Sequence, residues 1–130
     1  MRKSATFSVW LAVFGMFAGS IQGHHAIPLK LDRKNPVTLR GTVKEFRLEN
    51  PHASLFIDVK DDNGKTVNWT LEGGPVRGFV LMGFTEDTLP AGQAVTVIAY
   101  PSVAGGPVGQ LFSITLPDGK KYGGGPNLLP

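Results

Sequence analysis

The strongest constraint on the fold is the alternation of apolar and polar residues in short segments that glycine and proline interrupt. The 130 residues include 17 Gly and 10 Pro, whereas charged residues make up only 18 %. An amphipathic helix would instead need longer segments with apolar residues three or four positions apart. The sequence therefore predicts short strands that are joined by many turns.

Five segments carry the period-two pattern of strands that bury one face. They span residues 37–48, 53–59, 66–71, 94–100 and roughly 110–116, and residues 120–122 could add a short return strand. In the first segment the pattern slips by one residue after Val43, which predicts a β-bulge. The only helical pattern covers residues 76–84, and Gly83 is placed to end it.

The connection between the second and third segments fixes their register. Residues 62–64, Asp-Asn-Gly, suit a three-residue hairpin loop with Gly64 in the left-handed conformation. The register that follows pairs apolar residues throughout: Val59 with Val67, Ile57 with Trp69 and Leu55 with Leu71. A two-residue loop would shift the register and place Ile57 opposite Thr70. The match of apolar partners favours the longer loop, and it places Trp69 in the core.

The element order is three strands, a short helix and two strands. This is the order of the OB-fold, in which a long, bent first strand lets a small sheet close on itself. We therefore expect a mainly all-β chain that forms a small five-stranded OB-like barrel, with one short helix between strands 3 and 4. An open β-sandwich fragment is the alternative.

The N-terminal residues have the layout of a secretory signal peptide. Arg2 and Lys3 precede an uncharged stretch that runs to Gly23 and holds an apolar run followed by small residues. The apolar run is about a dozen residues, shorter than the roughly 20 that span a bilayer, although a retained N-terminal anchor is the alternative. We expect a signal peptide at 1–23, a barrel domain at 24–122 and a flexible tail at 123–130. Cleavage after Ser20 and cleavage after Gly23 both remain open; only the second makes His24 the first residue.

The predicted export, the net charge and the absence of cysteine limit the classes of binding partner. The chain has no Cys, which excludes disulfides and a lipid-anchored cysteine and fits the bacterial periplasm, with no stable membrane anchor after cleavage. Loss of Arg2 and Lys3 would lower the formal charge from +3 to +1. We therefore expect no nucleic-acid partner, because phosphate binding needs a basic surface.

Motifs for catalysis are missing. The sequence has no thiol nucleophile, no phosphate-binding loop and no Gly-x-Ser-x-Gly motif. No nucleophile and base can be paired, so we assign no catalytic residues, and an enzyme is the least supported class.

The three histidines, His24, His25 and His52, are the candidate metal ligands. His52 is out of phase with the inward-facing Ala53, so we expect its ring to point outward. If cleavage follows Gly23, the α-amino group and imidazole of His24 could chelate one ion with His52, assisted by His25. Nitrogen ligands in one plane suit copper(II). Glu72, which the hairpin register places diagonal to His52, would orient an imidazole without binding the metal.

Two interpretations need no metal. The histidines could simply make the N-terminus polar and exposed. Alternatively, the outward face around Phe56 and the loop at 101–108 could form a binding module of the cell envelope, which docks another envelope protein or a small ligand.

Several short motifs together resemble one family. They are His24-His25, residues 36–43, the Asn50-Pro51-His52 triplet, residues 62–64, Trp69, Glu72, Gly83, residues 89–92 and residues 116–119. The resemblance is to small exported bacterial proteins known only as a domain of unknown function, and it covers residues 24 to about 122. It implies a periplasmic β-barrel domain of uncharacterised role, and it favours cleavage just before His24.

Overall fold

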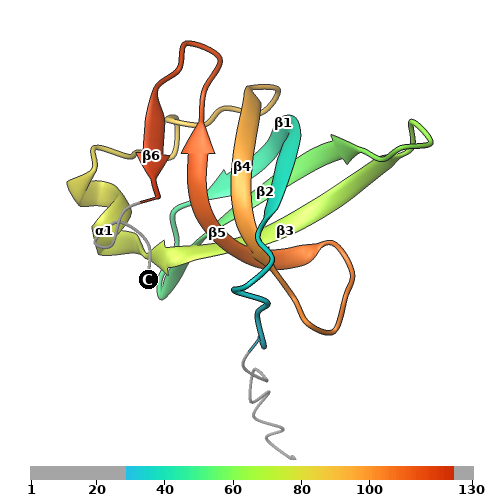
Figure 1. The fold of residues 1–130 in the computed structure, drawn as a ribbon. Helices are drawn as coiled ribbons and strands as arrows, with labels where there is room; N and C mark the ends of the chain where they lie inside the picture. Colours follow the sequence, from blue (N-terminus) through green and yellow to red (C-terminus); the bar gives the residue numbers. More distant parts are fainter. Residues whose placement is uncertain (1–28, 125–130) are drawn as a thin grey trace, which may run out of the picture.

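The computed structural model describes residues 29–124, which form one β-barrel with a single short helix (Figure 1). The elements in chain order are β1 (Val37–Arg47), β2 (His52–Lys60), β3 (Thr66–Pro75), α1 (Val76–Leu81), β4 (Ala94–Pro101), β5 (Val108–Thr115) and β6 (Lys121–Gly123). Within these residues, no helix has the length and apolar character needed to cross a membrane.

The sheet closes on itself. Its order is β3-β2-β1-β4-β5-β6, and an additional parallel pairing between β3 and β5 joins the two sides of the sheet. The barrel is therefore formed by β1 to β5, and β6 pairs with β5 outside that ring. The expected OB-like barrel is confirmed, with α1 between the third and fourth strands. The chain does not adopt the open sandwich.

Strand β1 lies between two partners and bends between them. Gly41 faces Val59 of β2 and also Val95 of β4. A Cβ atom at Gly41 would collide with the carbonyl oxygen of Asp58, so glycine permits the close approach of β1 and β2. The register with β2 shifts between Val43 and Glu45, which confirms the predicted bulge.

The hairpin between β2 and β3 has the predicted loop and register. Gly64 has a φ of 77°, and the backbone N–H of Asp61 donates to the carbonyl of Lys65 over 2.9 Å. The Asp61 carboxylate accepts hydrogen bonds from the backbone N–H groups of Asn63 and Lys65. All three predicted apolar pairs are present: Val59–Val67, Ile57–Trp69 and Leu55–Leu71. Trp69 is only half-buried, because it packs against the edge of the core.

Helix α1 is shorter than the predicted span of 76–84. Gly83 has a φ of 85°, and its N–H donates to the carbonyl of Val80, while the N–H of Phe84 donates to the carbonyl of Phe79. These two bonds form the Schellman arrangement that ends a helix at a left-handed glycine. The rings of Phe79 and Phe84 lie 5.2 Å apart, and both contact Phe46 of β1. This cluster joins α1 to the barrel core.

We predict that Gly41→Ala destabilises the protein, whereas Gly78→Ala does not. The new methyl group at residue 41 would force β1 and β2 apart, at a cost of about 1–3 kcal/mol. Gly78 lies within α1 with no atom near its would-be Cβ, so alanine there should stabilise the helix by about 0.5–1 kcal/mol. Urea unfolding of both variants measures the two changes. Equal changes would contradict the assigned role of Gly41.

A second prediction concerns Ser113 on β5, whose buried hydroxyl has no hydrogen-bond partner within residues 29–124. Ser113→Ala removes this unpaired group and should raise the free energy of unfolding by on the order of 1 kcal/mol. The matched control is Ser102→Ala, because the buried Ser102 hydroxyl accepts a hydrogen bond from the N–H of Ala104. The control should lose about 1 kcal/mol. A loss in both variants, measured by urea unfolding, would refute the prediction for Ser113.

Candidate functional site

His52 and Glu72 form a polar contact on the outer surface of the barrel. His52 is the first residue of β2, and its Nδ1 atom lies 2.7 Å from Oε1 of Glu72 on β3. The two side chains are 45 % and 51 % exposed, so both point outward, as the alternation predicts for His52. Glu72 faces Ser54 directly, as the predicted register requires, and the register then shifts between Ser54 and His52. The pair is therefore diagonal across the two strands.

This contact determines how the imidazole can be used. A hydrogen bond to the carboxylate requires the proton on Nδ1, which leaves the lone pair of a neutral ring on Nε2. Histidines that bind metals have this arrangement, in which a carboxylate accepts from one ring nitrogen and the other nitrogen binds the ion. The contact therefore leaves Nε2 as the ring nitrogen that could bind an ion or accept a proton.

The pair lies in a surface pocket of about 290 Å³. The lining residues come from three strands, the β1–β2 connection and the segment before β1: Leu29, Pro51, His52, Ser54, Thr70, Glu72, Val108 and Gly109. The pocket forms where β5 joins β3 and completes the barrel, because Thr70 faces Val108 in that parallel pairing. It combines hydroxyl, carboxylate and imidazole groups with an apolar rim. Sequence reasoning missed Ser54 and Thr70, although the same alternation that turns His52 outward also turns them outward.

The chain approaches this pocket through residues 29–35, here called the entry segment. Leu29 lines the pocket, and Leu31 forms an isolated bridge with Ser102 in the connection between β4 and β5. Within residues 29–124 there is no group of three or more His, Cys, Asp or Glu side chains that could hold a metal. His24 and His25 lie outside the described residues, so His52 and Glu72 are the two members of the predicted site that the structure brings together.

The entry segment contains a charged turn. The hydrogen bond from the side-chain amide of Asn35 is the main reason why the pKa of Asp32 lies below its ordinary value of 3.8. Loss of hydration raises this pKa, whereas hydrogen bonds from the backbone N–H groups of Lys34 and Asn35 lower it further. Because the pKa of Asp32 is lower in the folded state, the turn stabilises that state above about pH 4. This contribution is lost as the pH falls through the lowered pKa.

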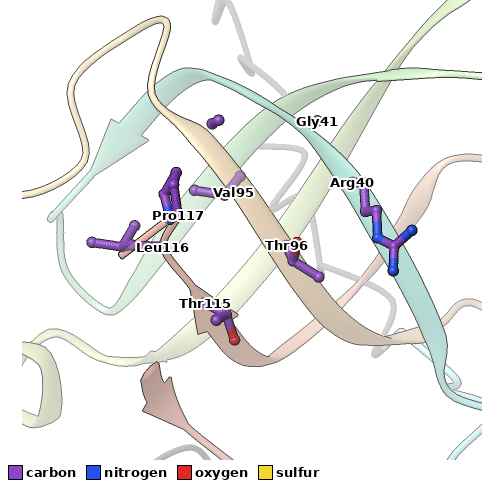
Figure 2. A pocket seen from close by; sticks show the side chains of 8 residues that line it. Arg40, Gly41, Val95, Thr96, Thr115, Leu116 and Pro117 are labelled. Carbon is purple, nitrogen blue, oxygen red and sulfur yellow. The ribbon is translucent and has the colours of Figure 1, made fainter. Parts of the chain in front are cut away.

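A second pocket, of about 300 Å³, lies against β1, β4 and β5. Figure 2 shows Arg40, Thr96 and Thr115 on these three neighbouring strands. The side chains that line it include no imidazole and no carboxylate. The chemistry of the His52 pocket is therefore the more specific of the two.

Phe56, the centre of the metal-free interpretation, is half-buried. The guanidinium of Arg47 lies 4.9 Å from the centre of its ring. Arg47 also donates to both carboxylate oxygens of Glu45 and thereby holds the pKa of Glu45 below its ordinary value. Within residues 29–124, the exposed large apolar side chains lie in two places. Leu29, Val103 and Val108 are at the pocket rim and in the adjoining connection, and Val80 and Leu81 are on α1.

We predict that Glu72 sets the tautomer of His52. In the wild type, the neutral ring should carry its proton on Nδ1; in Glu72→Ala, the acceptor is gone and the Nε2–H form should become populated. Nitrogen-15 NMR of the imidazole distinguishes the two forms. The control is Glu86→Ala, which removes an exposed carboxylate elsewhere and should leave the ring unchanged. An identical tautomer in wild type and Glu72→Ala would contradict the proposed hydrogen bond.

Comparison with known proteins gives a family and no activity. No curated protein and no solved structure matches the chain. Residues 13–111 match a family described as a family of unknown function (DUF6152), and this range contains all three histidines and Glu72. Since the match covers more than half of the 130 residues, the chain belongs to this family.

Proposed function

We propose that the protein is exported to the periplasm and binds a transition metal, copper, through His24 and His52, with His25 assisting and Glu72 orienting His52. The observation that carries this proposal is the 2.7 Å contact between His52 Nδ1 and Glu72, in a pocket whose wall includes Leu29. The contact leaves Nε2 of His52 available as a ligand. Leu29, the first described residue, lines the same pocket.

The length of the preceding chain fits this assignment. His24 is five residues before Leu29, and an extended chain of five residues spans at most about 18 Å. This length would allow the α-amino group and the imidazole of His24 to reach His52. This version of the site requires removal of residues 1–23 as a signal peptide, because a chain that begins at Ile21 has its amino group three residues away.

The proposed donor set favours copper(II) over zinc. An amino nitrogen and two imidazole nitrogens form a neutral, nitrogen-rich group of ligands, and such sites favour copper(II) in a planar or tetragonal geometry. Zinc sites in proteins more often use four ligands in a tetrahedron. No catalytic step is assigned to the site.

A second candidate function is a metal-free docking module of the cell envelope. The observation that favours it is the exposed apolar rim, in which Leu29 is 37 % and Val108 is 36 % exposed, beside Val103 at 55 %. In OB-folds this face of strands 2 and 3, with the connection between strands 4 and 5, commonly binds ligands. The ligand would be another envelope protein or a small molecule.

Copper titration of the processed protein tests the proposed function. Mass spectrometry first establishes that the chain begins at His24. His52→Ala should then weaken copper(II) binding by tenfold or more, because it removes a ligand. Asn63→Ala at the opposite end of the β2–β3 hairpin is the control and should bind like the wild type.

Two results would overturn the copper proposal. One is a mature chain that begins at Ile21, which removes the amino-group chelate. The other is equal copper affinity in wild type and His52→Ala. In the second case the docking module gains support if Val103→Asp abolishes binding to an envelope partner that the wild type retains.

A further inference from the structure

A row of three polar side chains crosses the outer face of the barrel at the second pocket, the one of about 300 Å³. Arg40 on β1 faces Thr96 on β4, and Thr96 in turn faces Thr115 on β5. Directly opposed residues on neighbouring antiparallel strands project to the same face of the sheet, with their Cα atoms about 5 Å apart. One guanidinium and two hydroxyl groups therefore stand next to one another on three successive strands (Figure 2).

The polar groups of this row are available to a ligand. Arg40 is exposed, and its guanidinium takes part in none of the side-chain hydrogen bonds, ion pairs and cation–π contacts formed within residues 29–124. Thr96 and Thr115 are half-buried at the pocket wall. A guanidinium carries five N–H donors and no acceptor, and it can pair with a carboxylate through two parallel hydrogen bonds. The row therefore offers hydrogen-bond donors and one positive charge to an anion.

The charges around the pocket also favour an anion. No carboxylate lines it, and Lys60 on β2 lines the neighbouring pocket of about 280 Å³ together with Arg40. The acid of that neighbouring pocket, Asp58, accepts a hydrogen bond from the side-chain amide of Asn68. Asp118, in the turn after β5, is not among the lining residues. An anion beside Arg40 would therefore lie near two positive charges and one carboxylate that already has a partner.

The rest of the pocket lining is apolar apart from the backbone at Gly41, and it consists of Ala94, Val95, Leu116 and Pro117. Figure 2 shows Val95, Leu116 and Pro117 gathered together, away from Arg40. Pockets that hold small molecules combine an apolar surface with a few polar groups that fix orientation, and about 300 Å³ is at the lower end of their range. The pocket is thus matched to a short molecule with an anionic end and an apolar body.

From this arrangement we infer that the pocket binds a small organic carboxylate. Its charged group contacts Arg40, Thr96 and Thr115, and its apolar body contacts Leu116 and Pro117. A carboxylate fits better than a phosphate, because one guanidinium balances one negative charge and its planar donors match two carboxylate oxygens. The pocket is built on β1, β4 and β5, whereas His52 and Glu72 lie on β2 and β3, so the inference does not depend on the proposed metal site.

The test is a titration of the purified protein with octanoate, followed by the amide chemical shifts in two-dimensional NMR. We expect the shift changes to concentrate at residues 94–96 and 115–117, which line the pocket. 1-Octanol has the same apolar body without the charge, and inorganic phosphate has a charge without the apolar body. Each should bind at least tenfold more weakly than octanoate, because each makes only one of the two kinds of contact.

Three variants, each checked for an unchanged circular dichroism spectrum, test the assigned contacts. Arg40→Gln should weaken octanoate binding tenfold or more, because it removes the charged partner of the carboxylate. Thr96→Val keeps the shape of the side chain but loses the hydroxyl, and it should weaken binding about two- to tenfold. Lys44→Gln is the matched control: it removes an exposed cation of the same strand that does not line the pocket, and it should bind octanoate like the wild type.

Four results would overturn the inference. They are shift changes that lie away from the pocket, wild-type affinity for octanoate in Arg40→Gln, and an affinity for 1-octanol equal to that for octanoate. The fourth is an affinity for phosphate equal to that for octanoate, which would show an anion site at Arg40 without a role for the apolar lining.

Discussion

The short parallel pairing between β3 and β5 is the contact on which the rest of the structure depends. It joins Thr70–Glu72 to Val108–Gln110 and converts an open sheet into a barrel. Gly109 lies within this pairing, and a Cβ atom there would lie 2.5 Å from the carbonyl oxygen of Tyr100 on β4, so glycine permits the close approach of β5 to its other neighbour. The candidate site lies at this junction because three strands and the entry segment meet there. The pairing that closes the barrel therefore also forms the pocket.

The parts of the fold that depend on near neighbours could be predicted from the sequence. The loop at 62–64 fixes the β2–β3 register, a slip in the alternation marks the bulge in β1, and Gly83 marks the end of α1. Each is a local consequence of turn geometry or of the two-residue period. The extension of β3 to Pro75 could not be predicted in this way. Gly73 and Gly74 interrupt the alternation, and pairing with β2 continues the strand to Pro75.

The candidate site likewise has one part that follows from local sequence and another part that depends on long-range contacts. The outward direction of His52 and its diagonal neighbour Glu72 follow from alternation and register, both local properties. The pocket depends on Leu29, Val108 and Gly109, which reach it only through the long-range closure of the barrel. The hydrogen bond from Arg33 in the entry segment to Gln110 shows the difference most clearly, since these residues are 77 positions apart in sequence. No spacing rule relates two residues at that separation.

The β2–β3 hairpin places the His52 pocket and the loop at residues 62–64 at opposite ends of two long strands. His52 and Glu72 are at one end, and the tip at residues 62–64 is at the other, where the hairpin projects beyond the barrel (Figure 1). His52 and Lys60 are eight positions apart on β2, so the strand separates them by about 26 Å. Because the chain contains no cysteine, a single thiol introduced at Asn63 would be unique. A fluorophore or surface linker attached there would leave the pocket open to solvent.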